Sequence, residues 1–200
     1  MQLYQQTTPF TCAVCSFLMI LKHFRKDIPL TREKEFEIWH QSALLPCRAA
    51  SLYRLALLAK QYGLPVKIIV GQHEYKFPRY RFKGYKLKEV QLASYASELY
   101  YRQAKQGGIP ILERDFTFDE VKAFLRAGKV LLLRLNSGTL RGEGDKLAVK
   151  YFAVLAFTEG NFIVPDPQGV VRQVPEVLMK TAFHDVKEKS KRDNRMMVVG

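Results

Sequence analysis

The sequence has few cysteines and lacks both a secretory signal and a long apolar run. Three cysteines, Cys12, Cys15 and Cys47, are an odd number for a disulfide framework, and the first residues lack the basic region of a signal peptide. We therefore expect a reduced, cytoplasmic protein without structural disulfides. The apolar run at 17–21 ends at Lys22, far short of the ~20 residues that a membrane-spanning helix needs, so no transmembrane segment is predicted.

Acidic residues are also scarce, with 19 Asp and Glu against 32 Lys and Arg and a net charge of +13. Such an excess is typical of proteins with acidic partners, among them nucleic acid, an anionic membrane surface and acidic peptides. Charge alone does not choose among these partners, and a lysine-rich surface also serves solubility. The 200 residues contain no repeat or low-complexity tract, and this length predicts one domain over residues 1–200.

Helical and strand patterns alternate along the chain without an obvious linker. Apolar spacing and capping residues predict helices at 12–24, 31–40, 51–62, 88–105, 117–127 and 175–183. Strands are predicted at 65–70, 109–112, 130–135, 150–157, 162–164 and 170–174, with 196–199 as a closing edge strand. We expect a loop at 136–145 and a turn at 166–169. The chain is therefore predicted to be α+β, with helices first and an antiparallel sheet later.

The segment before the first helix places a cysteine at the helix start. Thr11 is a plausible N-cap, and apolar residues recur at helical spacing from Val14 onward, so Cys12 takes the first helical position. The positive end of the helix dipole favours a thiolate there. Gln6 could supply a side-chain amide as an oxyanion donor. The alternative is that Cys12 is only a small core residue.

A second motif lies in the sheet, where the strand at 150–155 leads to Asp166-Pro167. With Gln6 six residues before Cys12, this order resembles that of the C39 and C39-like cysteine peptidases, which include the bacteriocin-processing double-glycine peptidases. The resemblance implies a papain-like fold, with N-terminal helices and the cysteine at a helix start packed on a C-terminal antiparallel sheet. It also implies a cysteine peptidase or thiol acyl hydrolase that acts on a peptide or protein without a cofactor or metal.

The same resemblance assigns roles and shows where the chain departs from the family. It implies that Cys12 is the nucleophile, that Gln6 stabilises the oxyanion and that Asp166 orients the base, and it puts Lys150 where the family has histidine. A lysine acts as a base near neutral pH only when it is strongly desolvated or beside other cations. Two functions stay open: a hydrolase, and an inactive homologue that binds peptides or acidic ligands. Tyr151 is expected to point away from the face of Lys150.

None of the four histidines begins the strand that should face Cys12. His23, His40, His73 and His184 are predicted on or beside helices or in a loop, where an ordinary surface histidine is the simpler interpretation. The Cys-x-x-Cys pattern could indicate a redox pair or half of a zinc site, but no second ligand pair accompanies it. We predict no metal site.

The stretch at 74–88 interleaves aromatic and basic residues. Lys76, Arg79, Arg81 and Lys83 could contact nucleic-acid phosphates while neighbouring rings stack on bases. The alternative is an edge strand or loop whose aromatic residues pack inward. A basic nucleic-acid-binding protein is therefore a third candidate function, and the sequence predicts no oligomeric state.

Overall fold

The computed structural model describes residues 2–74, 77, 82–143 and 148–200. Its helices are α1 (Cys12–Phe24), α2 (Arg32–Ser42), α3 (Leu52–Gln61), α5 (Leu87–Gln106), α6 (Phe118–Arg126), α7 (Ser137–Arg141) and α8 (Glu176–Glu188). Its strands are β1 (Ala43–Leu44), β2 (Ala49–Ala50), β3 (Val66–Val70), β4 (Ile111–Glu113), β5 (Val130–Asn136), β6 (Val149–Val154), β7 (Ala156–Thr158), β8 (Asn161–Asp166), β9 (Val170–Pro175) and β10 (Arg195–Val199).

Helix starts follow the capping residues of the sequence. The Thr31 hydroxyl accepts a hydrogen bond from the Lys34 amide at the start of α2. At α6, Thr117 and Glu120 form a reciprocal capping box, which satisfies amides that have no partner inside the helix. These two predicted helix starts are confirmed.

The main sheet has the strand order β4-β3-β10-β5-β6. Its neighbours are antiparallel except β3 and β4, which run parallel. The prediction that 196–199 forms an edge strand is wrong, because β10 lies between β3 and β5 in the centre of the sheet. Every residue of β10 is buried, so the C-terminal segment completes the core.

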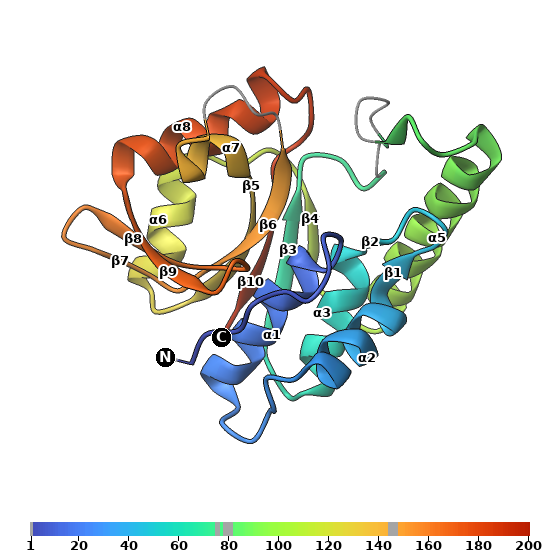
Figure 1. The fold of residues 1–200 in the computed structure, drawn as a ribbon, viewed down its shortest axis with the longest axis horizontal. Coiled ribbons are helices and arrows are strands. Elements are labelled where there is room, and N and C mark those ends of the chain that lie inside the picture. Colours follow the sequence, from blue (N-terminus) through green and yellow to red (C-terminus); the bar gives the residue numbers. More distant parts are fainter. Residues whose placement is uncertain (1, 75–76, 78–81, 144–147) are drawn as a thin grey trace.

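Two hydrophobic layers cover the two faces of this sheet. On one face, α1 and α3 pack against Tyr151 and Ala153 of β6, while on the other Phe152 and Val154 pack with residues of α6 and α8. Figure 1 shows the sheet between these layers, with α1, α2, α3 and α5 on one side and α6, α7 and α8 on the other. The predicted α+β arrangement, with α1 packed on a largely antiparallel sheet, is confirmed.

The last part of the chain adds a three-stranded antiparallel sheet, in the order β7-β8-β9. The predicted turn after β8 is present, where the Gly169 amide donates to the Asp166 carbonyl at 2.9 Å and Gly169 has a φ of 84°. The prediction of a loop from Asn136 onward is wrong, because α7 forms there. The Asn136 side chain caps this five-residue helix by accepting from the Gly138 amide, a helix too short for apolar periodicity to reveal.

Helix α5 spans 20 residues beside the other N-terminal helices. Ala93 and Ala104 of this helix are buried, and charged residues separate its apolar ones. No helix within the described ranges combines the length and the apolar character that crossing a bilayer requires.

Candidate functional site: a cavity beside Cys12

The first residue of α1 lies at a small cavity between the helical layer and the main sheet. Cys12 is 5% exposed, and its place at the helix start confirms the prediction. The cavity has a volume of about 30 Å³ and is lined by Phe10, Cys12, Ala13, Ala49, Ala50, Arg134, Val149, Lys150, Tyr151 and Arg192. Cys12 and the start of β6 are therefore brought together, as expected.

The register of β6 decides which side chain faces α1. Tyr151 belongs to the hydrophobic layer of α1, and its carbonyl accepts a hydrogen bond from the Ser16 hydroxyl at 3.1 Å. Lys150 pairs across the ladder with Leu135, which belongs to the layer on the opposite face. Because side chains alternate along a strand, Tyr151 projects toward the face that carries Cys12. Lys150 projects away from it, although it contributes to the cavity wall.

This geometry corrects the expected pairing of Lys150 with Asp166. The Asp166 carboxylate accepts hydrogen bonds from Arg141, at 2.6 and 2.9 Å, and from Arg172 at 2.7 Å. In the part of the chain that the structure describes, Lys150 has no ion-pair partner. Arg141 is the last residue of α7 and Arg172 lies in β9. These two elements place both arginines around the end of β8.

Asp166 is completely buried and remains a carboxylate. Burial by itself raises the pKa of this carboxyl group, but the hydrogen bonds from Arg141, Arg172 and the Gln168 amide outweigh it and hold the pKa below its ordinary value. Two guanidinium groups thus compensate one buried charge. This arrangement ties β8, β9 and α7 together, whereas the sequence predicted that Asp166 orients a base.

Gln6 makes two hydrogen bonds that fix its segment. Its side-chain amide nitrogen donates to the Thr8 carbonyl at 2.8 Å, within its own segment. Its backbone amide donates to the Pro167 carbonyl at 2.8 Å, which attaches the segment to the turn after β8. One hydrogen of this amide is therefore used within the segment, and the role of Gln6 as an oxyanion donor stays a prediction.

A buried carboxylate that sequence reasoning missed holds the same segment. Glu35 of α2 is fully buried and accepts hydrogen bonds from the Tyr4 hydroxyl at 2.9 Å and the Thr7 hydroxyl at 2.6 Å. It also accepts from the Thr7 amide at 3.2 Å. Burial, followed by the contact with Glu35, raises the pKa of Tyr4. Glu35 is thus a positioning residue for the chain that leads into Cys12, and its charged neighbours in sequence gave no signal of this.

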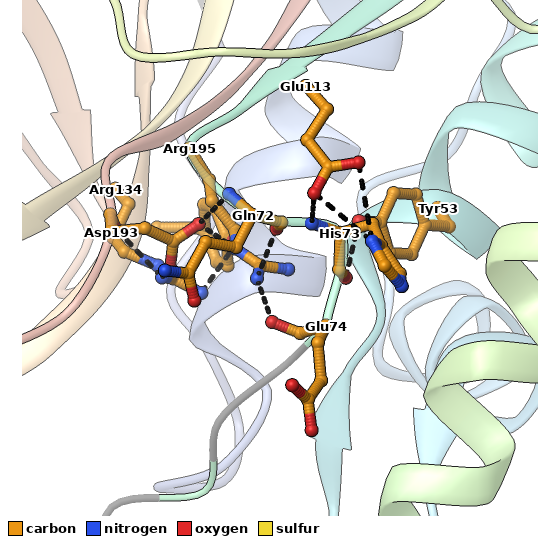
Figure 2. Close-up of polar contacts among 9 residues, drawn as sticks. Tyr53, Gln72, His73, Glu74, Glu113, Arg134, Asp193 and Arg195 are labelled. Atoms are coloured by element: carbon orange, nitrogen blue, oxygen red, sulfur yellow. Dashed lines mark hydrogen bonds and ion pairs between the residues drawn. The ribbon is translucent and has the colours of Figure 1, made fainter.

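A second missed cluster, of charged residues, borders the cavity. Arg134 of β5 is 1% exposed and donates to the Tyr151 hydroxyl at 3.2 Å and to the Asp193 carboxylate at 2.9 Å. Asp193 also accepts from Arg195 at 2.7 Å. Arg195 in turn donates to the carbonyls of Gln72 and Glu74, as Figure 2 shows. Two arginines therefore share the Asp193 carboxylate close to the cavity.

The same network reaches β4 through the segment after β3. The His73 amide and ring both contact the Glu113 carboxylate, at 3.0 and 3.1 Å, and the Tyr53 hydroxyl donates to the His73 carbonyl at 2.8 Å (Figure 2). The hydrogen bonds from His73 lower the pKa of Glu113. His73 is thus occupied away from Cys12. His23, His40 and His184 are also absent from the cavity lining.

A larger cavity adjoins the first one. It has a volume of about 130 Å³ and is lined by Pro9, Phe10, Cys47, Arg48, Ala49, Phe82 and Tyr85. Phe10 and Ala49 line both cavities, so the two are neighbouring parts of one groove. We call this combined surface the Cys12 groove. The smaller end is lined by Arg134, Arg192 and Tyr151, and the larger end by Arg48, Phe82 and Tyr85.

The second cysteine of the Cys-x-x-Cys pattern belongs to the core. Cys15 is fully buried, its thiol donates to the Tyr4 carbonyl at 3.3 Å, and burial raises its pKa. Among the described residues, no group of three histidine, cysteine or acidic side chains could hold a metal ion. The burial of Cys15 supports its interpretation as a core residue.

Comparison with known proteins decides the family. A model described as the Peptidase_C39 like family matches residues 1–191. The chain belongs to this Peptidase_C39-like family. The resemblance inferred from Gln6, Cys12 and Asp166-Pro167 is confirmed. No curated protein matches the chain.

Two solved structures are similar to this family member, each with 11% sequence identity and a TM-score of 0.49. One is a double glycine motif protease from an AMS/PCAT transporter, crystallised with a leader peptide. The other is the peptidase domain of Streptococcus ComA, a bi-functional ABC transporter involved in quorum sensing. The alignments cover all of this chain, and 91% and 97% of those chains respectively.

Proposed function

We propose that this Peptidase_C39-like protein binds an extended peptide in the Cys12 groove without hydrolysing it. The observation that carries the proposal is the identity of the side chain opposite the helix start. Tyr151, rather than an imidazole, occupies the β6 position that faces α1.

The chemistry of thiol hydrolysis supports this choice. A thiol hydrolase needs a group that takes a proton from the sulfur and returns one to the leaving amine near neutral pH. A phenol ordinarily titrates near pH 10, and the hydroxyl of Tyr151 already accepts a hydrogen bond from Arg134. Lys150 projects to the other face of the sheet, and Asp166 is occupied by Arg141 and Arg172. The groove therefore lacks a proton shuttle among its described residues.

The shape of the groove suits an extended chain. Its two parts meet at Phe10 and Ala49, and Ala49 belongs to the short strand β2. A peptide that crosses Ala49 would place one side chain against Phe82 and Tyr85 and the next group beside Cys12. The alternative function, hydrolysis through Cys12, uses the same groove and differs only in turnover.

The nucleic-acid alternative has less support. Lys76, Arg79 and Arg81 lie outside the described residues, while Lys83 is exposed. Phe82 is buried in a small cluster with Leu44, Cys47 and Ala93, and Tyr85 packs against that cluster. The ring of Phe82 packs inward and presents no open face to stack on bases, so the other interpretation of this stretch is favoured.

The proposal is tested by measuring the binding of a synthetic peptide library to three variants, two of them a matched pair of arginine substitutions. Ala49→Arg places a long side chain where the two cavities meet, and Ala127→Arg adds the same charge at the exposed end of α6. We expect Ala49→Arg to abolish binding, while Ala127→Arg and Cys12→Ala retain it. Equal binding by both arginine variants would overturn the proposal.

A further inference from the structure

We propose that β9 is a second binding site, at which an extended acidic segment of a partner protein adds a strand to the β7-β8-β9 sheet. In this sheet β8 lies in the middle, and among the described residues β9 pairs with β8 alone. The other edge of β9 is therefore open. None of the described residues that line the Cys12 groove comes from β9, so this site is separate from the groove.

The register of β8 and β9 shows which backbone groups point outward. In an antiparallel pair, residues that exchange hydrogen bonds alternate with residues whose amide and carbonyl point away from the partner strand. Val171 lies opposite Pro165, which has no amide hydrogen to exchange. Gln173 lies opposite Ile163, whose carbonyl accepts from the Leu155 amide at 2.9 Å, on the side of β7. Val171 and Gln173 therefore direct their amides and carbonyls outward, away from β8.

This edge lacks the features that usually protect an edge strand. Proteins block such edges with lysine, with proline inside the strand, or with a bulge. β9 contains no lysine, its pairing with β8 is continuous, and Pro175 is its last residue. Its charged side chain, Arg172, is engaged by Asp166. Val170 and Val171 are each 44% exposed and point to opposite faces, so an added strand would cover an apolar side chain on both faces.

The outward backbone groups specify the chemistry of the occupant. Two residues of a strand that are two positions apart present their amide and carbonyl groups about 7 Å apart. An extended polypeptide repeats its own groups at the same interval, which is why strand addition recognises peptides through the main chain. The chain carries a net charge of +13, and β9 has no acidic residue. Charge complementarity therefore favours a segment with acidic rather than basic side chains.

A second copy of this chain fits the edge less well. Two copies bring together two net charges of +13, which repel each other. Antiparallel pairing of β9 with its copy is symmetric about one residue, and a centre at Arg172 places two guanidinium groups directly opposite each other. A centre at Gln173 sets Val171 against Pro175, which has no amide hydrogen. A centre at Val171 sets Gln173 against Gly169, whose amide already donates within the turn after β8.

The first experiment measures backbone hydrogen exchange in the protein alone by NMR. We expect the amides of Val171 and Gln173 to exchange at least about tenfold faster than those of Arg172 and Val174, which the register directs to β8. Slow exchange at Val171 and Gln173 at every protein concentration would overturn the proposal, because the edge would then be covered. Slow exchange that is lost on dilution would overturn it in favour of a second copy.

The second experiment titrates acetyl-Thr-Val-Glu-Val-Thr-amide into isotope-labelled protein and follows the amide signals by NMR. We expect shifts confined to β9 and slower exchange at Val171 and Gln173. The matched peptide acetyl-Thr-Val-Lys-Val-Thr-amide should bind severalfold more weakly. Equal binding of the two peptides, or no shift in β9, would overturn the proposal. Shifts at residues of the Cys12 groove alone would contradict this second site while supporting the function proposed above.

Proline substitutions test whether the main chain makes the contact. Val171→Pro removes one outward amide and leaves the hydrogen bonds to β8 in place, as proline does on edge strands. We expect the glutamate peptide to bind roughly fivefold more weakly, the effect of about one hydrogen bond. Val177→Pro makes the same change at an exposed position in the first turn of α8, where the amide has no helical partner, and should leave binding unchanged.

Thermal unfolding of both proline variants shows whether they are folded. Gln173→Pro removes the other outward amide and replaces Val171→Pro if that variant does not fold. Binding of the glutamate peptide to a folded Val171→Pro or Gln173→Pro variant with the affinity of wild type would overturn the proposal.

Discussion

Arg134 and Tyr151, on neighbouring strands, lie directly opposite each other in the β5–β6 ladder, and the guanidinium donates to the hydroxyl at 3.2 Å. The guanidinium also lies over the ring, 5.2 Å from its centroid. Tyr151 is thereby fixed on the face of the sheet that carries Cys12. A buried cation thus holds the ring that faces α1 at the cavity beside Cys12.

Replacing Tyr151 by phenylalanine tests this contact. The variant keeps the ring and removes one hydrogen bond to a charged, buried group, so we expect a loss of about 1.5–3 kcal/mol in the free energy of unfolding. Tyr95→Phe, which removes an exposed hydroxyl on α5, should change it by less than about 0.5 kcal/mol. Urea unfolding of both variants measures the difference. Equal midpoints would show that the Arg134–Tyr151 contact adds nothing to stability.

Histidine substitutions test the register of β6. Tyr151→His puts an imidazole on the face of Cys12, whereas Lys150→His puts it on the other face. We expect the rate of Cys12 alkylation by iodoacetamide to gain an inflection near pH 6.5, the ordinary pKa of histidine, in Tyr151→His alone. An inflection in Lys150→His and none in Tyr151→His would contradict the assignment of faces.

Asp166 should contribute stability that depends on pH. Its folded-state pKa lies below the ordinary value, so its contribution is fully present above about pH 4 and is lost as the pH falls through the folded pKa. Asp166→Asn leaves Arg141 and Arg172 without their carboxylate. This change should lower the free energy of unfolding by about 3–5 kcal/mol at pH 7.

Urea unfolding across pH 2–7 measures this effect. The difference in the free energy of unfolding between wild type and Asp166→Asn should shrink below pH 4. Asp119→Asn breaks an ion pair at the surface with Lys122 and should leave the free energy of unfolding nearly unchanged at every pH, because solvent screens such pairs. A stability difference between wild type and Asp166→Asn that does not change with pH would rule out this dependence of stability on the ionisation of Asp166.

Glu35→Gln tests the anchoring of the segment before Cys12. Glutamine has one acceptor oxygen in place of two, so it cannot accept all the hydrogen bonds from Tyr4 and Thr7. We expect the free energy of unfolding to fall by about 2 kcal/mol and backbone hydrogen exchange at residues 4–11 to become faster. Glu37→Gln, on the exposed side of the same helix, is the matched control. Unchanged exchange in Glu35→Gln would show that the segment is held by other contacts.

The elements that the sequence predicted correctly are those with local signals. The start of α1 at Cys12, the Thr117–Glu120 capping box and the turn at Asp166 each depend on residues a few positions apart. The central place of β10 depends on pairing with β3, more than a hundred residues earlier, and short-range patterns do not contain such information.

The site was predicted only in part, for a similar reason. Tyr151, Phe152, Ala153 and Val154 are all buried because β6 is covered on both faces, so the apolar alternation that reveals the inward face is missing. The sequence therefore placed Lys150 opposite Cys12, where the structure places Tyr151. The sequence also did not predict the partners of Asp166, because Arg141 lies in a short helix that has no apolar pattern.

The most direct test of the central claim is a search for peptide cleavage that depends on Cys12. Wild type and Cys12→Ala are incubated with the synthetic peptide library at pH 5–9, and new peptide termini are identified by mass spectrometry. We predict that both proteins retain the same peptides and that neither produces new termini. Termini that arise with wild type and disappear in Cys12→Ala would contradict the account, and would show that this groove hydrolyses its peptide without histidine.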